Sequence, residues 1–215
     1  MKVLINKKLH EINKHQFQSL VNGFKPISLD IGTGSGKTIY NNALRNPNNY
    51  YIGLDSCAAG MFDNSARMAK LEKKRKYTNA LFVVSTIENP PEELYGTADI
   101  ISVILPWGSL RDGIIKAEAG IIQNLRLLGK EKTQLSVLTG YDQKIEPSEM
   151  IERELPVLSI DYFKKIAMKY YEHKIKLFDI RTVDNKGLKQ VDSDWAKRLA
   201  YGAERIMYAL TFEFE

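Results

Sequence analysis

The sequence is poor in the features that define secreted, membrane-embedded and metal-binding proteins. Its single cysteine, Cys57, excludes an intramolecular disulfide framework and fits a reducing, cytoplasmic environment. No segment approaches the roughly 18 apolar residues of a membrane span, and residues 1–20 contain no apolar run long enough for a signal peptide. The three histidines stand alone, without the spacing of metal ligands. We therefore expect a cytoplasmic protein that contacts no membrane and binds no metal.

A complete phosphate-binding loop is also missing. Gly36-Lys37-Thr38 resembles the end of a Walker A motif, but Ile31 occupies the position where that motif requires its first glycine. The apolar run that ends in Asp30 is typical of the first strand of a nucleotide-binding α/β fold, and it is followed by Gly32, Gly34 and Gly36. An acid in this loop repels a pyrophosphate and attracts the ammonium group of S-adenosylmethionine (SAM). The loop favours SAM, with a phosphate ligand as the alternative.

The pattern of the rest of the chain predicts one α/β domain. After Pro26, short apolar runs alternate with longer amphipathic segments, as in a parallel sheet with crossover helices. Strands are expected at residues 27–31, 50–54, 81–85, 98–105, 134–139, 174–183 and 205–214. Helices are expected at residues 36–45, 57–75, 112–128, 147–154, 159–171 and 193–200. The last two strands lack a long crossover helix, which favours an antiparallel terminal strand in a seven-stranded, mostly parallel sheet.

The N-terminal part precedes this pattern. We interpret residues 1–22 as an N-terminal extension, a short hairpin followed by a helical turn, and residues 23–215 as a single domain.

Acids follow three successive strands of the predicted sheet. Asp30 ends the first strand, Asp55 ends the second, and Glu88 follows the third after Thr86 and Ile87. Because ligands bind at the carboxyl ends of strands in open α/β sheets, we expect Asp55 to hold the ribose and residues 86–88 to contact the adenine of the cofactor. The structural alternatives are a helix-capping Asp55 and a Glu88 that is merely exposed in a loop. Three acids suit the cationic, phosphate-free SAM.

Two tryptophans lie on segments that follow predicted strands. Trp107, in the loop Pro106-Trp107-Gly108-Ser109, is outside any periodic core position, so its ring is available to stack on an extruded base. Packing of the loop against the sheet is the alternative. Trp195 and Arg198 are three residues apart on a short predicted helix, so both face one side. Together the two tryptophans suggest a stacking site for a flipped purine.

Basic residues form a candidate RNA-binding surface. A nearly continuous positive run ends the second predicted helix, with the alternative that it is only a solvated helix face. We expect its members, together with basic residues from later segments, to contact RNA phosphates. The candidates are Arg67, Lys70, Lys73, Lys74, Arg75, Lys76, Lys144, Arg153, Lys197, Arg198 and Arg205.

Four motifs in this order and spacing resemble the aminoglycoside-resistance 16S rRNA methyltransferases of the Kam/Npm type, over essentially the whole chain. They are DIGTGSG at residues 30–36, YIGLD at 51–55, LPWGSL at 105–110 and WAKRLAYG at 195–202. Enzymes of this family methylate N1 of the decoding-site adenine, adenine 1408, in the 30S subunit. The resemblance implies a class I SAM-dependent methyltransferase fold of the Rossmann-like type with an N-terminal hairpin.

The resemblance also implies roles for individual residues. Asp30, Gly32, Asp55 and Glu88 would contact SAM, and Ser109 and Ser193 would line the pocket. Trp107 and Trp195 would hold the flipped adenine, while Arg198 and Arg205 would grip RNA. The sequence departs from the family pattern at Ala203-Glu204, where we expect more basic residues.

The chemistry implied by the resemblance needs few catalytic side chains. Adenine N1 has a lone pair and no proton to lose, so the rate depends on alignment and not on a general base. We expect a monomer that acts on the 30S subunit. The alternatives are a SAM-dependent methyltransferase of another RNA or a small molecule, a non-catalytic RNA-binding module, and a phosphate-loop nucleotide-binding enzyme.

Overall fold

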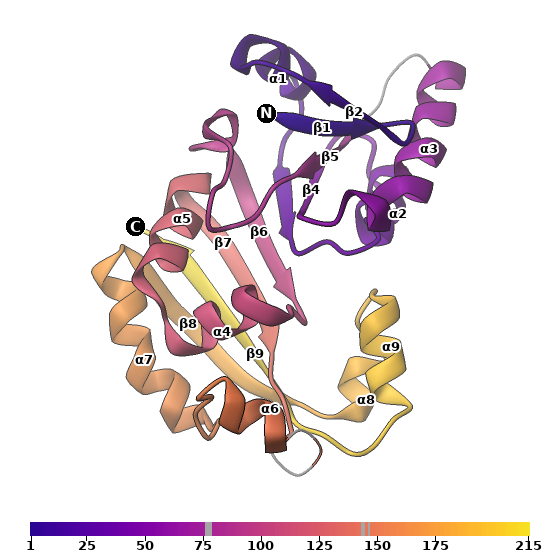
Figure 1. Ribbon diagram of the computed structural model, residues 1–215. Coiled ribbons are helices and arrows are strands. Elements are labelled where there is room, and N and C mark those ends of the chain that lie inside the picture. Colours follow the sequence, from indigo (N-terminus) through magenta and orange to yellow (C-terminus); the bar gives the residue numbers. More distant parts are fainter. Residues whose placement is uncertain (76–78, 143–144, 146) are drawn as a thin grey trace.

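The apolar runs of the sequence form a single mixed sheet at the centre of the molecule. Figure 1 shows a computed structural model of the chain, which describes residues 1–75, 79–142, 145 and 147–215. Within these residues nine strands pair in the order β2-β1-β5-β4-β3-β6-β7-β9-β8. The strands are β1 (Lys2–Ile5), β2 (Lys8–Glu11), β3 (Ile27–Ile31), β4 (Tyr50–Asp55), β5 (Ala80–Val84), β6 (Ala98–Ile104), β7 (Gly129–Thr139), β8 (Ile175–Val183) and β9 (Met207–Phe214).

The seven strands from β3 to β9 confirm the predicted fold class. Strands β3 to β7 are parallel, and β9 lies antiparallel between β7 and β8. The predicted count of seven strands was wrong for the whole sheet, because the N-terminal hairpin does not stay apart from it. Strand β1 pairs antiparallel with both β2 and β5 and thereby extends the sheet to nine strands. The carboxyl ends of β3 to β7 therefore still meet at one edge, as a cofactor site requires.

Helices cover both faces of the sheet, because successive side chains of its strands point to opposite faces and are apolar on both. Helices α2 (Lys37–Arg45) and α3 (Ala58–Arg75) pack on Tyr51, Ala80 and Phe82. The intervening residues of the same strands, such as Ile52 and Leu81, join a larger core under α4 (Gly108–Lys116), α5 (Ala119–Leu128) and α7 (Ile160–Glu172). In Figure 1 these two groups of helices lie on different sides of the sheet.

The predicted helix at residues 112–128 was wrong. Two helices occupy this region, and they are separated at Ala117, which has a left-handed conformation with φ of 53°. The N–H of Ala117 bonds the carbonyls of Gly113 and Ile114, which ends α4. The chain then turns, and α5 begins at Ala119. Helix α4 begins at Gly108, directly after Trp107 and four residues before the predicted start at residue 112.

Short helices complete the fold. They are α1 (Lys14–Val21), the 3-10 helix η1 (Glu92–Leu94), α6 (Pro147–Glu152), α8 (Asn185–Leu188) and α9 (Asp194–Ala200). Helix α9 rests on a separate apolar cluster, in which Ala196 and Ala200 contact Leu105, Leu138 and Met207 at the ends of β6, β7 and β9. This cluster brings the segment between β8 and β9 to the carboxyl edge of the parallel strands.

The sheet ends on β2 at one edge and on β8 at the other. All four residues of β2 are exposed. Strand β8 is irregular, with a register shift between Leu177 and Asp179 in its pairing with β9. Among the described helices, none is long and apolar enough to cross a bilayer.

Candidate active site

A cleft with a volume of about 290 Å³ opens at the carboxyl ends of β3, β4 and β5. It contains most of the residues that the sequence nominated for the cofactor. They are Gly32, Asp55, Thr86, Ile87, Glu88 and Ser109, and Trp107 stands beside them. No lysine or arginine lines this cleft among the residues that the structure describes. The cleft therefore offers carboxylates and backbone groups to a ligand, and no side-chain cation for a phosphate.

The glycine loop after β3 shapes one wall of the cleft. The N–H groups of Gly32 and Thr33 both donate to the carbonyl of Leu54, at 2.8 and 3.2 Å, which folds the loop across β4. Gly36 has φ of 66°, and a Cβ there would lie 2.5 Å from the ring of Phe82. Only glycine fits so close to the core in this conformation. The requirement explains the third glycine of the motif without any phosphate ligand.

Asp55 fixes the loop and the start of the next helix together. One carboxylate oxygen accepts a hydrogen bond from the N–H of Gly34 at 2.8 Å, and the other accepts from the N–H of Cys57 at 2.8 Å. Asp55 therefore makes the contacts of a turn aspartate before the next helix, which was the alternative interpretation of this residue. Each oxygen keeps lone pairs for a further donor, and the residue also lines the cleft.

The segment after β5 forms the opposite wall. Ser109 Oγ donates to Glu88 Oε1 at 2.7 Å, so the loop after β5 contacts the first turn of α4. Burial opposes ionisation of Glu88, but hydrogen bonds from Ser109, the backbone and Thr86 outweigh it and lower its pKa. Asn124 of α5, which the sequence analysis missed, donates to the carbonyls of Ile87 and Glu88 at 2.8 and 3.0 Å. The sequence indicates this residue only weakly, as one of two adjacent amide side chains in the otherwise mostly apolar helix AGIIQNLRLL.

Asp30 lies in a second cavity, which has a volume of about 700 Å³ and shares Gly32, Gly34 and Trp107 with the first. Its carboxylate is buried and accepts a hydrogen bond from Ser102 Oγ at 2.6 Å. Burial raises the pKa of Asp30 above its usual value. Ser193, nominated for the cofactor, also lines this second cavity, where its Oγ accepts from the N–H of Ala196 and caps α9. These two residues are thus set apart from the others that were nominated for the cofactor.

The two tryptophans meet beside the second cavity, which both of them line, and Trp107 also lines the first cleft. Their ring centroids are 5.1 Å apart, and their planes are inclined at 69°, an edge-to-face contact. Trp107 is 56% exposed and precedes α4, whereas Trp195 is half-buried in the first turn of α9. The structure therefore brings together two residues that are far apart in the sequence. The rings are not parallel, so a base enters between them only after they separate.

Comparison with known proteins decides the family. The family model described as NpmA, 16S rRNA (adenine(1408)-N(1))-methyltransferase, matches residues 2–213. The chain belongs to this family. A 16S rRNA (adenine(1408)-N(1))-methyltransferase from Escherichia coli is 32% identical over 98% of this chain and 97% of its own length. A methyltransferase with the same description from Streptoalloteichus tenebrarius is 27% identical, over 98% of each chain.

Solved structures agree with this assignment. A mutant 16S rRNA (adenine(1408)-N(1))-methyltransferase from Catenulisporales acidiphilia, crystallised with its cosubstrate SAM, has a TM-score of 0.88 and is 28% identical. It matches 100% of this chain and 96% of its own. The 16S rRNA methyltransferase KamB has a TM-score of 0.87 at 25% identity, with both chains fully covered. This member of the NpmA family is accordingly a SAM-dependent methyltransferase.

The basic residues nominated for RNA binding in this methyltransferase lie in three places. Arg67, Lys70, Lys73 and Lys74 are exposed along α3. Arg75 ends that helix, and Lys76 and Lys144 fall outside the described residues. Lys197 is exposed on α9. Arg198 lines the second cavity, and Arg205 lines a small third cavity together with Trp107 and Trp195. Arg198 and Arg205 thus each line a cavity together with both tryptophans.

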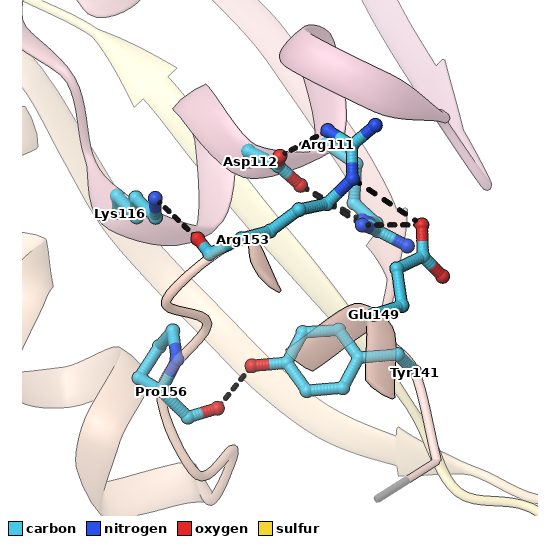
Figure 2. Close-up of polar contacts among 7 residues, drawn as sticks. All are labelled: Arg111, Asp112, Lys116, Tyr141, Glu149, Arg153 and Pro156. Carbon is cyan, nitrogen blue, oxygen red and sulfur yellow. Dashed lines mark hydrogen bonds and ion pairs between the residues drawn. The ribbon is translucent and has the colours of Figure 1, made fainter. Parts of the chain in front are cut away.

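Arg153 is engaged in an ion-pair network that the sequence did not reveal (Figure 2). Its Nη1 lies 2.8 Å from Asp112 Oδ2, and its Nε lies 3.5 Å from Glu149 Oε1. The buried Arg111 binds the same two acids at 3.0 and 3.1 Å. The network joins α4, which follows Trp107, to α6. Arg153 is therefore paired with acids, in contrast to the exposed lysines of α3.

Proposed function

We propose that this methyltransferase transfers the methyl group of SAM to N1 of adenine 1408 in the 16S rRNA of the 30S subunit. The observation that carries the proposal is the edge-to-face pair of Trp107 and Trp195, since Trp107 lines the acidic cleft and both rings line the adjoining second cavity. An enzyme that acts on a base edge must take the base out of its stack and hold it by stacking. Two aromatic rings beside a SAM cleft suit that task.

The residues of the cleft fit the cofactor. A cationic ligand without phosphates suits a site in which Asp55 and Glu88 are present and no lysine or arginine is. We assign Asp55 to the ribose hydroxyls, because its carboxylate is fixed by two N–H groups and still has free lone pairs. Thr86, Ile87 and Glu88 would enclose the adenine, with Ser109 fixing Glu88. Gly32 would let the backbone approach the methionine part, with Asp30 and Ser193 on the side of the second cavity.

The same residues argue against the phosphate-loop alternative. Lys37, which would face a phosphate in a Walker A loop, is absent from the lining of the first cleft. Its Nζ instead lies 2.8 Å from Asp194 Oδ1. Lys37 lines the second cavity, where this ion pair with Asp194 engages it.

The chemistry follows from alignment. Bound SAM would supply a methyl group on its sulfonium, which would pass to the lone pair of adenine N1 while the electrons of the broken S–CH3 bond stay on the sulfur of the departing S-adenosylhomocysteine. N1 carries no proton, so no side chain has to act as a general base. Trp107 and Trp195 would hold the ring so that N1 faces the methyl group, and correct placement of two reactants is worth up to roughly 7–11 kcal/mol. The tryptophans are thus the catalytic residues, although they exchange no proton.

The RNA would be held by the basic residues around this pocket. Arg67, Lys70, Lys73, Lys74 and Arg75 of α3 would contact backbone phosphates over a wide surface that is read by shape. Arg198 and Arg205 would contact the phosphates next to the extruded base. Arg153 would join them only if a phosphate competes with Asp112 and Glu149 for its guanidinium.

We also propose that the protein acts as a cytoplasmic monomer. Residues 23–215 would form its single domain, and residues 1–22 an N-terminal extension. Methylation of the decoding-site adenine would give resistance to aminoglycosides that bind there.

The test is methyl transfer from radiolabelled SAM to purified 30S subunits, with reverse transcription to locate the modified base. We expect incorporation into 30S subunits and a stop at adenine 1408, because N1 methylation blocks the Watson–Crick edge. 50S subunits serve as the control and should remain unlabelled. Incorporation at another base would reject adenine 1408 as the methylated base. SAM binding without any incorporation would reject 16S rRNA as the substrate.

A further inference from the structure

Helix α2 is tied to the segment that leads into α9 by three polar contacts. Lys37 Nζ lies 2.8 and 3.0 Å from the two carboxylate oxygens of Asp194. Arg45 Nη1 lies 2.9 Å from Asp192 Oδ2, and Thr38 Oγ1 donates to the carbonyl of Asp192 at 2.9 Å. We call these three contacts the α2–α9 latch. The contacts connect positions about 150 residues apart in the sequence. The hydrogen bond from Lys37 also lowers the pKa of Asp194.

The latch adds polar contacts to the start of α9, where Val191 and Trp195 also pack on the apolar cluster. Ala196 and Ala200 fix the helix against the ends of β6, β7 and β9. Residues 192–194 precede or begin the helix and face α2. A helix of seven residues has little stability of its own, so tertiary contacts at both ends determine its position. Trp195 follows Asp194 directly, and its direction depends on the first turn of α9.

The latch also begins at the cofactor loop. Lys37 is the first residue of α2 and follows the glycines whose backbone shapes the SAM cleft. The side chains of Lys37 and Asp194 are 47% and 53% exposed. Exposed ion pairs of this kind contribute little to global stability, so support of the fold alone does not account for two of them and a hydrogen bond on one short segment.

We propose that Lys37, Thr38 and Arg45 are positioning residues, which hold Trp195 over the SAM cleft by fixing residues 192–194 to the helix that starts at the cofactor loop. This inference rests on the proposed function, because it assigns these residues a role in presenting the target base. It also gives the Gly36-Lys37-Thr38 motif a purpose other than phosphate binding. The lysine and the threonine contact the protein's own base-holding segment.

The test is a charge swap at the pair Lys37 and Asp194. Lys37→Glu and Asp194→Lys alone should each lower kcat for methylation of saturating 30S subunits by about tenfold, since a misplacement of about 1 Å costs up to roughly 100-fold. The Kd for SAM and the Tm should stay unchanged in both variants. The double variant should recover most of the lost kcat, because it restores an ion pair in the opposite sense.

A matched control separates positioning from a general loss of positive charge. Lys132 is an exposed lysine that pairs with Glu213 at 3.7 Å, far from the cleft along β7. Lys132→Glu changes the net charge by the same amount as Lys37→Glu. We expect it to keep the kcat and the SAM affinity of the original protein.

A second readout reports Trp195 directly. In a Trp107→Phe background the intrinsic tryptophan fluorescence comes from Trp195 alone, since the chain has two tryptophans. Lys37→Glu should shift the emission and increase quenching by acrylamide, and the charge swap should reverse both. This comparison requires no activity.

Three outcomes would reject the inference. One is an unchanged kcat and unchanged fluorescence in Lys37→Glu, when the original protein methylates 30S subunits. Another is a double variant whose kcat is as low as that of the single variants, together with Trp195 fluorescence that is unaltered in all three. This result would mean that Lys37 contacts the RNA itself. If the original protein does not methylate 30S subunits, the proposed function fails, and unaltered fluorescence in Lys37→Glu would then reject the positioning role.

Discussion

The two sides of the active site are held in different ways. On the cofactor side, at the ends of β3 to β5, Asp55 and Asn124 bind backbone groups of the very loops that line the cleft. On the base side, Trp195 packs on the apolar cluster under α9 and against the ring of Trp107, and exposed ion pairs hold the residues just before it. The cofactor side is held through backbone groups of the loops themselves, whereas ion pairs between two exposed, flexible side chains exchange readily with water and other charges.

The difference matches the two ligands. SAM is a small molecule with a constant shape, and a site that is formed before binding does not have to spend binding energy on ordering itself. In the proposed function, the target base leaves its stack in RNA and enters between the rings of Trp107 and Trp195, which touch each other in this structure. A side held by exchangeable contacts can open for it. We therefore expect substitutions on the two sides to affect different steps.

The largest effect is expected on the base side. Trp107→Ala or Trp195→Ala should lower methylation of 30S subunits by about 100-fold, because stacking of a base on an aromatic ring is worth up to about 3 kcal/mol. The affinity for SAM, measured by calorimetry, should not change. Phenylalanine at either position is the control and should keep much of the activity. An equal loss of SAM affinity in the alanine variants would show that the tryptophans hold the whole site together.

Removal of Asp55 should show the opposite pattern. Asp55→Ala should raise the Kd for SAM by about 10–100-fold, since hydrogen bonds to a charged group contribute about 1.5–3 kcal/mol. Binding of 30S subunits without SAM should stay the same. Asp63→Ala removes an exposed aspartate on α3 that pairs with Lys7, and it should leave SAM binding intact. A weaker affinity for 30S subunits in Asp55→Ala would contradict the separation of the two sides.

A smaller effect on the cofactor side is expected at Asn124. Asn124→Ala should raise the Kd for SAM by about 2–10-fold, because two neutral hydrogen bonds to the segment after β5 are lost and each is worth about 0.5–1.5 kcal/mol. Gln123, its exposed neighbour on α5, provides the matched control as Gln123→Ala. If both variants bind SAM like the original protein, the carbonyls of Ile87 and Glu88 do not need this anchor.

The smallest effect concerns stability. Burial raises the pKa of Asp30 above its usual value of 3.8, so the folded state binds its proton more tightly than the unfolded state does. The protein therefore loses stability as the pH rises from 3.8 through the higher folded-state value, and the loss persists at neutral pH. Asp30→Asn, which still accepts from Ser102, should raise the Tm at pH 7 by about 2–4 °C. The gain should vanish near pH 3, and a lower Tm at pH 7 would refute it.

The sequence predicted the cofactor side better than the base side, for a physical reason. The cofactor side depends on local patterns, namely an apolar strand followed by glycines and acids at the strand ends. The latch joins residues whose positions differ by 157 in the sequence, and nothing in either segment indicates the other. The same holds for Arg153, whose network depends on how α6 meets α4. Long-range polar contacts of this kind appear only after the fold has been assembled.

The errors in the fold have similar causes. The hairpin joins the sheet because β5 has a free edge, and a free edge is a property of the assembled sheet. The helix predicted at 112–128 is divided at Ala117, which has a left-handed conformation. Alanine rarely adopts this conformation and favours helices, so the sequence gives no sign of the break. The roles of the individual site residues stay predictions, although the structure places most of the residues predicted for the cofactor around one cleft and brings the two tryptophans together beside the adjoining cavity.

The edges of the sheet determine how copies of the protein meet one another in a crowded solution. A free strand edge can add a strand of another molecule, which leads to aggregation unless the edge is short, charged or irregular. Strand β2 has only four residues, all exposed, and among them are Lys8, His10 and Glu11. Strand β8 carries Lys176, Asp179 and Arg181, and its bulge interrupts a regular ladder. Neither edge therefore offers a long, regular and uncharged template for the addition of another strand.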